Sequence, residues 1–189
     1  CMNRPRAAGF CYDDVEIDTM FKDAEILLEN GADGISFGFL NPDATINITH
    51  TKKMVELIHR YRKEAVFHRA FDCVSDPYVA IQQLIDCGVD RILTSGLQPT
   101  ALQGCELLKK LQSEFGEQVE ILAGSGINVD NIETLRERTG IHQFHGSCKT
   151  WRKDPTTTVG NMSYAYHEKD DYDCVSTTNV LQVVQLLKK

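Results

Sequence analysis

The sequence predicts an α/β fold, a TIM-type (β/α) barrel that is incomplete and has six βα units. Short apolar segments alternate with amphipathic helical segments, the pattern of a parallel sheet covered by helices. The expected strands begin about 28 residues apart, as in the units of a (β/α) barrel, near residues 1, 34, 65, 90, 119 and 143. No GxGxxG follows a first strand, so a dinucleotide-binding fold is unsupported.

Apolar residues at helical spacing predict five helices between these strands and one after them. Proline in the first turn after an aspartate predicts that a helix begins at Asp76-Pro77, and Thr49 or Thr51 is the expected cap of the helix before it. The expected helices span residues 18–30, 49–63, 77–88, 99–115, 128–139 and 177–188. The expected strands after the first span residues 34–40, 65–71, 91–95, 119–123 and 143–147, and residues 148–176 are expected to be irregular.

The number of units is smaller than a closed barrel needs. Eight units of this size need about 224 residues, and the chain has 189. We therefore expect one domain over residues 1–189 in which the first two of eight units are missing. A strand at residues 1–4 and the strand at 143–147 would flank the gap. The isolated chain would then be poorly soluble, or a second copy of the chain would cover these open edges.

Composition excludes some classes of partner. The net charge is −7, whereas nucleic-acid-binding domains usually carry a basic face, so no nucleic acid is expected as a partner. No apolar run approaches the ~20 residues of a membrane helix, so no membrane is expected either. Seven scattered cysteines without any CxxC pair favour reduced thiols and a cytoplasmic protein.

Polar and glycine residues collect where the expected strands end. In a parallel barrel all these ends meet at one rim, the face that carries catalytic residues. The rim candidates are Arg4 and Arg6; His68, Arg69 and Asp72; Ser95 and Gly96; Gly124, Ser125 and Gly126; and His145.

Two kinds of chemistry are expected at this rim. Arg4 or Arg6, with the turn at 124–126 and a helix beginning near Asn128, would hold a phosphate or carboxylate of a small molecule. Arg69, Ser95 and Gly96 are further candidates for anion binding, while His68, Asp72 and His145 are candidates for proton transfer. Each also has an ordinary structural explanation, as an exposed charge, a core histidine or a tight turn.

Several of these residues form motifs of a known family. These motifs are R-P-R at 4–6, F-H-R-A-F-D at 67–72, D-P at 76–77, L-T-S-G at 93–96, G-S-G-I at 124–127 and F-H at 144–145. With them, the chain resembles the CutC copper homeostasis protein family over residues 1 to about 150, and F-H-R-A-F-D is the most specific segment.

The resemblance implies a TIM-type barrel, a cytoplasmic location and a copper-related role, with Cu(I) as the bound ion. The thiols proposed as copper ligands in the family lie on its first two units, which have no counterpart here. The family also usually has G-G-G-I where this chain has G-S-G-I at 124–127. Cys73 and Cys148, which follow rim histidines, remain as weak candidate ligands because Cu(I) prefers thiolates.

Two functions therefore stay open at the level of sequence. The resemblance favours a CutC-like copper homeostasis protein that binds or carries copper in the cytoplasm. The rim chemistry favours a TIM-barrel enzyme or ligand-binding protein for a small metabolite that bears a phosphate or carboxylate. The sequence does not decide whether the chain is an enzyme.

Overall fold

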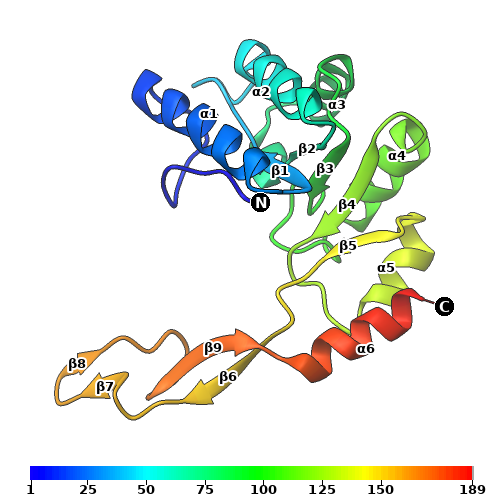
Figure 1. The fold of residues 1–189 in the computed structure, drawn as a ribbon. Coiled ribbons are helices and arrows are strands. Elements are labelled where there is room, and N and C mark those ends of the chain that lie inside the picture. The colour runs from blue at the N-terminus through cyan, green and yellow to red at the C-terminus, as the bar shows by residue number, and fades with distance from the viewer. Residues whose placement is uncertain (189) are drawn as a thin grey trace.

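The computed structural model describes residues 1–188 as an open parallel sheet, its covering helices and a projecting antiparallel arm (Figure 1). The elements are α1 (Asp14–Glu29), β1 (Gly34–Phe37), α2 (Ile48–Arg60), β2 (Glu64–Phe67), the 3₁₀ helix η1 (Arg69–Cys73), α3 (Pro77–Asp86), β3 (Arg91–Thr94), α4 (Cys105–Phe115), β4 (Glu120–Gly124), α5 (Ile132–Thr139), β5 (Gln143–His145), β6 (Lys149–Lys153), β7 (Thr158–Val159), β8 (Met162–Ser163), β9 (Asp171–Val175) and α6 (Thr177–Leu187).

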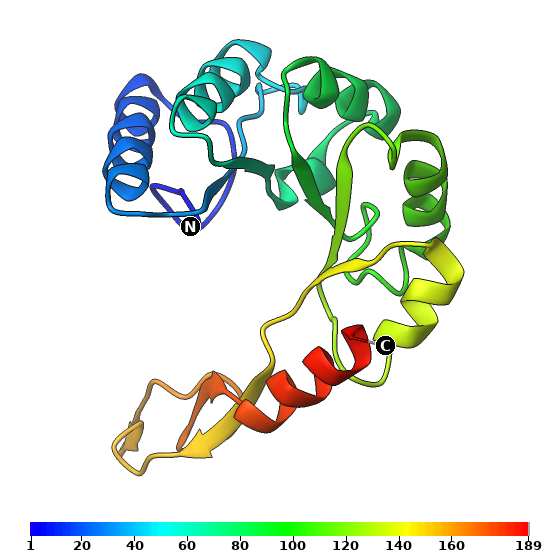
Figure 2. The same ribbon diagram turned by 45° about the vertical axis from the view of Figure 1, so that its right-hand side comes forward.

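Five parallel strands form the main sheet in the order β1-β2-β3-β4-β5, which confirms the predicted α/β class. Figure 2 shows the sheet as an arc with helices along its outer side. The strand expected at residues 1–4 is only a single bridge between Met2 and Ser36, where the Asn3 amide donates to the Ser36 carbonyl at 2.8 Å. Each strand thus lies beside the next one in sequence, as in a (β/α) barrel.

The hydrophobic core lies between the arc and its outer helices. Ile35 and Phe37 of β1 are buried, and they pack with helix residues such as Met20 and Ile58. The strand residues that alternate with these buried ones face the inside of the arc. Three of them, Ser36, Val66 and Leu122, are partly exposed. The inner face of the sheet is therefore only partly covered within residues 1–188.

Helix boundaries differ from the sequence prediction where side chains cap the backbone. α1 begins at Asp14, four residues before the expected start, because Asp13 and Glu16 form a reciprocal capping box. The cap of α2 is Asn47, so the expectation of Thr49 or Thr51 was wrong. The cap at Asp76 is confirmed, since its carboxylate accepts the amides of Tyr78 and Val79.

Other strand and helix boundaries also differ from the prediction, and they change where the loops at the rim begin and end. β2 ends at Phe67 instead of residue 71 because His68 caps η1, and α4 begins at Cys105 instead of residue 99. α5 begins at Ile132 and not near Asn128. The sequence predicted that the turn at 124–126 leads directly into the N-terminus of a helix, and this prediction was wrong.

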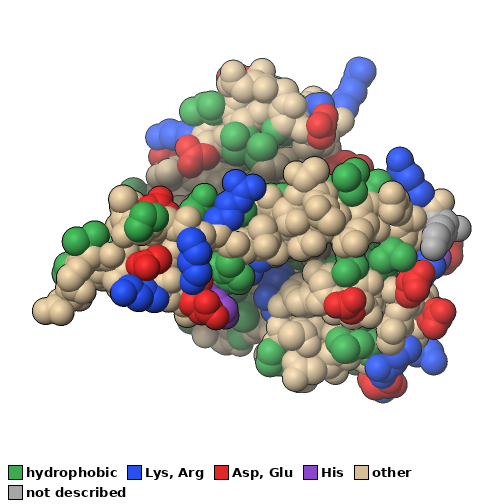
Figure 3. Space-filling model, turned by 90° about the horizontal axis from the view of Figure 1, so that it is seen from below, with side chains coloured by type: hydrophobic (Ala, Val, Ile, Leu, Met, Phe, Trp, Pro, Cys, Tyr) green, Lys and Arg blue, Asp and Glu red, His purple; other side chains and the backbone are tan. Residues whose placement is uncertain are grey.

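The irregular segment expected at 148–176 is instead largely an antiparallel arm. β6 pairs with β9, and β7 pairs with β8 at its tip. Trp151 stacks on His167 with ring centroids 4.9 Å apart, and the buried Asp171 carboxylate accepts the amides of His167 and Glu168. Figure 3 shows apolar and charged side chains interspersed on this projecting arm when it is seen from below.

The last helix, α6, ends at Leu187 and so confirms the predicted helix at 177–188. It lies beside α5 (Figure 1), and the Arg136 guanidinium donates to the Leu186 carbonyl at 3.5 Å. None of the helices described over residues 1–188 combines the length and the apolar character that crossing a membrane requires.

Candidate functional site

A cavity of about 330 Å³ lies at the carboxyl ends of β2, β3 and β5, and we call it the rim cavity. Carboxyl ends of parallel strands are where barrel folds carry their functional sites. The rim cavity brings together six residues that the sequence predicted as site residues, with Met2, Phe10 and Leu93 completing its wall. These six are Arg4, His68, Arg69, Asp72, Cys73 and His145.

The Asp72 carboxylate holds the loops around the rim cavity in place. One oxygen accepts the Thr94 hydroxyl at 2.6 Å and the amides of Ser95 and Leu97 at 2.9 and 3.2 Å. The other accepts the Arg69 Nε–H at 2.7 Å and the Ser95 hydroxyl at 3.0 Å. Donors therefore surround both oxygens, and this arrangement suits a positioning group better than the proton-transfer role that the sequence suggested.

The loop residues that Arg69 contacts fix the orientation of its side chain. Besides its bond to Asp72, its Nη2 donates to the Ser95 hydroxyl at 3.0 Å. The Arg69 side chain remains 42% exposed, whereas the Asp72 side chain is 7% exposed. Part of the guanidinium is thus fixed in orientation while its charge still faces the cavity.

Ser95 and Gly96 shape the rim instead of lining it. Both are buried, and the Gly96 amide donates to the Thr94 hydroxyl at 2.9 Å. Gly96 has φ +68°, which a residue with a side chain rarely adopts, and a side chain there would meet the backbone of Gly104. The structure places their contribution in loop conformation and not in the wall of the cavity.

His68 is buried, with 3% of its surface exposed. Its Nδ1 accepts the Ala70 amide at 3.2 Å, while its Nε2 has no hydrogen-bond partner. Burial, and secondarily the positive charge of Arg4, lowers the pKa of His68 to about 4. The imidazole is therefore neutral at pH 7.

The structure separates the two arginines that the sequence left as alternatives. Arg4 lines the rim cavity with its guanidinium over the Phe10 ring, 5.2 Å from the ring centroid. Its Nη2 donates to the Ala7 carbonyl, and its buried Nε has no partner. Arg6 forms an ion pair with Glu16 and donates to the Cys11 carbonyl at 2.8 Å. Arg6 thus braces the N-terminal loop against α1 and does not line the rim cavity.

The turn at Gly124-Ser125-Gly126 is also separate from Arg4. The Ser125 hydroxyl donates to the Pro99 carbonyl at 2.7 Å, and the Gly126 carbonyl accepts the Asn131 side chain at 2.7 Å. Gly126 lines a different cavity of about 400 Å³ beside α6, together with Cys148. The expected grouping of an arginine with this turn is therefore split between two cavities.

The sulfur and imidazole groups do not gather into a metal centre in the part of the chain that is described. Cys73 and the exposed His145 line the rim cavity, whereas Cys148 lies in the cavity beside α6. Within residues 1–188 no three His, Cys, Asp or Glu side chains lie close enough together to hold a metal ion. The two candidate thiols thus do not share a site.

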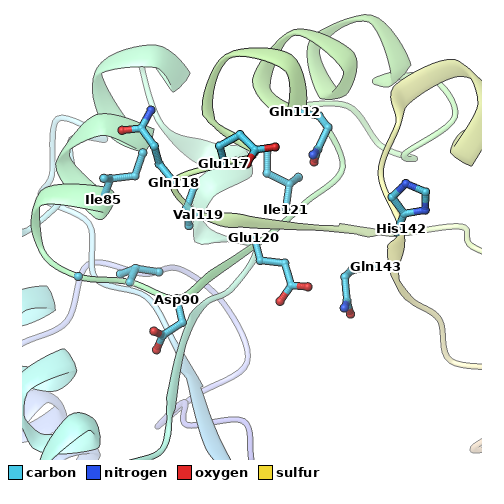
Figure 4. Close-up of a pocket in the computed structure, with 13 residues that line it drawn as sticks. Ile85, Asp90, Gln112, Glu117, Gln118, Val119, Glu120, Ile121, His142 and Gln143 are labelled. Atoms are coloured by element: carbon cyan, nitrogen blue, oxygen red, sulfur yellow. The ribbon is translucent and has the colours of Figure 1, made fainter.

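A larger cavity of about 580 Å³ lies at the opposite, amino ends of β3, β4 and β5 (Figure 4). Two of its three carboxylates have partners: Asp90 contacts His59 Nε2 at 2.9 Å and accepts the Ala65 amide at 2.7 Å, and Glu120 forms an ion pair with Arg91. In parallel barrels this face contributes to stability, so the rim cavity is the better candidate site.

A sequence model of the CutC family matches residues 1–150. The chain belongs to the CutC family. A CutC family protein of Treponema denticola is 36% identical to it, over 98% of this chain and 76% of the relative. A relative from Bacteroides fragilis is 42% identical over 77% of this chain, and the alignment spans 57% of that protein.

A solved structure supports the same assignment for the fold. It is named as a candidate copper homeostasis protein CutC of Streptococcus agalactiae. It aligns with a TM-score of 0.72 and 29% identity over 77% of this chain and 70% of that one. This CutC family chain therefore has a TIM-like α/β fold with a parallel sheet.

Three residues of the site were missed at the level of sequence. Phe10 contacts both Arg4 and His68, with its ring centroid 5.1 Å from that of the imidazole. Gly38 leaves room for His68, because a side-chain carbon there would lie 2.6 Å from its Cε1. Ala70 supplies the amide for Nδ1. Gly38 within the expected strand at 34–40 was a usable signal, and Ala70 lies only two residues after His68 in the motif at 67–72, whereas the contact of Phe10 depends on the fold.

The lowered pKa of His68 predicts a pH-dependent stability. Unfolding restores an ordinary pKa near 6.5, so between pH 6.5 and about 4 the unfolded chain binds a proton that the folded chain does not. The free energy of unfolding should therefore fall as the pH falls through this window, by about 3 kcal/mol from His68. Urea titrations of wild type and His68→Asn from pH 7.5 to 3.5 measure the difference, because asparagine keeps an acceptor for Ala70 but does not titrate. Parallel pH profiles would contradict the prediction.

Proposed function

We propose that the rim cavity binds a small metabolite through a phosphate or carboxylate group. The observation that carries this proposal is the buried, unpartnered Nε of Arg4 in a cavity that also receives the guanidinium of Arg69. Two guanidinium groups face one carboxylate there, that of Asp72, while His68 is neutral. The cavity thus carries a local positive charge in a chain whose net charge is −7.

The dimensions and chemistry of the cavity support a small ligand. A volume of about 330 Å³ is at the lower end of small-molecule sites. Phe10 and Leu93 supply apolar wall, and the arginines supply charged donors. Asp72 is occupied by its own donors, so the arrangement supports binding and polarisation of a ligand oxygen more directly than proton abstraction.

A role in copper homeostasis is the second candidate, supported by family membership and by the name of the Streptococcus agalactiae relative. High-affinity Cu(I) sites use clustered thiolates, with imidazole as a further ligand. The rim cavity contains one thiol, Cys73, and the cavity beside α6 contains one other, Cys148. These donors do not fit such a site, so the proposed function does not involve copper.

We further propose that the chain is one domain in which residues 1–3 and the five strands represent six successive units of an eight-unit barrel. The partly exposed inner residues Ser36, Val66 and Leu122 support an open arc. The seven cysteines are all free thiols, which supports a cytoplasmic location.

The open edges predict self-association. Within residues 1–188, β5 and the segment at residues 1–3 each leave one side of the sheet without a neighbouring strand, and exposed sheet edges promote pairing with another chain. Sedimentation velocity over a hundredfold range of concentration should show a dimer or larger species. A single monomeric species with one cooperative calorimetric transition would contradict this prediction.

The separation of Arg4 from Arg6 gives a direct test of anion binding. Arg4→Gln should weaken binding of inorganic phosphate or malonate by about 1.5–3 kcal/mol, because it removes a charge-assisted contact in the cavity. Isothermal titration calorimetry at low ionic strength measures the affinities. Melting temperatures without anion report any effect of the substitutions on folding.

Arg6→Gln is the matched control, because it removes the same charge outside the cavity. Its anion affinity should equal that of wild type. Equal losses in both variants would indicate a general effect of net charge, and unchanged affinity in Arg4→Gln would refute the proposed site.

A further inference from the structure

The hydrogen bond from Ala70 fixes which nitrogen of His68 carries the proton. A backbone amide only donates, so Nδ1 must present its lone pair to the Ala70 N–H, 3.2 Å away. A neutral imidazole has one ring proton, which then lies on Nε2. His68 therefore holds an N–H donor at Nε2 and no free lone pair.

This donor is buried and has nothing to bond within the protein. His68 is 3% exposed, and its Nε2 has no hydrogen-bond partner. Buried polar atoms are nearly always partnered in folded proteins, so an orphaned donor in the wall of a cavity points to a ligand atom. The Nε of Arg4, in the same wall, is orphaned in the same way.

The ring is held in one orientation by its neighbours. Phe10 and Phe67 lie against it with ring centroids 5.1 and 6.2 Å away. Gly38 allows the close approach, since a side-chain carbon there would lie 2.7 Å from Nδ1. A flip of the ring would place the carbon Cδ2 where Nδ1 lies and would give up the bond from Ala70.

Resting on the proposed function, we infer that the neutral His68 Nε2–H and the Arg4 Nε–H donate hydrogen bonds to oxygens of one ligand oxyanion, a carboxylate or phosphate. Arg4 supplies charge, while His68 requires that the facing atom be an acceptor. His68 is thus a specificity-determining residue that rejects ammonium groups.

The same tautomer disfavours a metal ion at His68. Coordination through Nε2 needs its lone pair, so the ring proton would have to move to Nδ1. Nδ1–H would then face the Ala70 N–H, and the hydrogen bond between them would be lost. The geometry therefore selects an oxyanion over copper at this nitrogen.

Nitrogen-15 NMR of the histidine rings in the full chain tests this inference, with inorganic phosphate and malonate as probes. Comparison with His68→Asn assigns the His68 signals among the six histidines. At pH 7 we expect the proton on Nε2, and we expect either anion to shift the Nε2 resonance and slow exchange of its proton. His68→Asn should bind the anions roughly tenfold or more weakly. His142→Asn, a matched substitution of an exposed histidine at the amino end of the sheet, should bind them as wild type does.

The outcomes separate the inference from the proposed function. Anion binding that depends on Arg4 but leaves the His68 signals and the affinity of His68→Asn unchanged would overturn the inference alone. A proton on Nδ1 would do the same. If neither anion binds the wild-type chain, the proposed function fails and the inference fails with it.

Discussion

The rim of the sheet depends on the buried carboxylate of Asp72. This one group accepts hydrogen bonds from η1 and from the end of β3 and the loop after it, so it ties the carboxyl ends of two neighbouring strands together. A buried charge is costly without donors, and here the hydroxyls, amides and guanidinium around it offset that cost. The positions of Arg69 and Ser95, and with them the shape of the rim cavity, follow from this network.

The network also determines which charges are left for a ligand. The Asp72 carboxylate accepts hydrogen bonds from the loop residues around it. Arg69, in contrast, keeps part of its guanidinium exposed, and Arg4 keeps a buried Nε without a partner. Burial and the charge of Arg4 keep His68 neutral by lowering its pKa to about 4. The rim cavity therefore combines fixed cationic donors with one uncharged donor, an arrangement that matches an oxyanion better than a soft metal ion.

The sequence was informative where short-range chemistry decides the structure. Apolar spacing predicted the order of strands and helices, and Asp76-Pro77 predicted a helix start. The motif at 67–72 identified the loop that carries His68, Arg69 and Asp72. Contacts between distant segments were not predictable: Glu16 pairs with Arg6 away from the rim cavity, the Pro99 carbonyl accepts the Ser125 hydroxyl, and Trp151 stacks on His167 in an arm that the sequence predicted as irregular.

A crystal structure of the chain grown with malonate, and a second with selenate located by its anomalous signal, tests the central claim most directly. The account predicts an anion in the rim cavity with oxygens within hydrogen-bond distance of Arg4 Nε and His68 Nε2. The Asp72 network should be unchanged. An anion bound only elsewhere, with Arg4 turned out to solvent, would contradict the account.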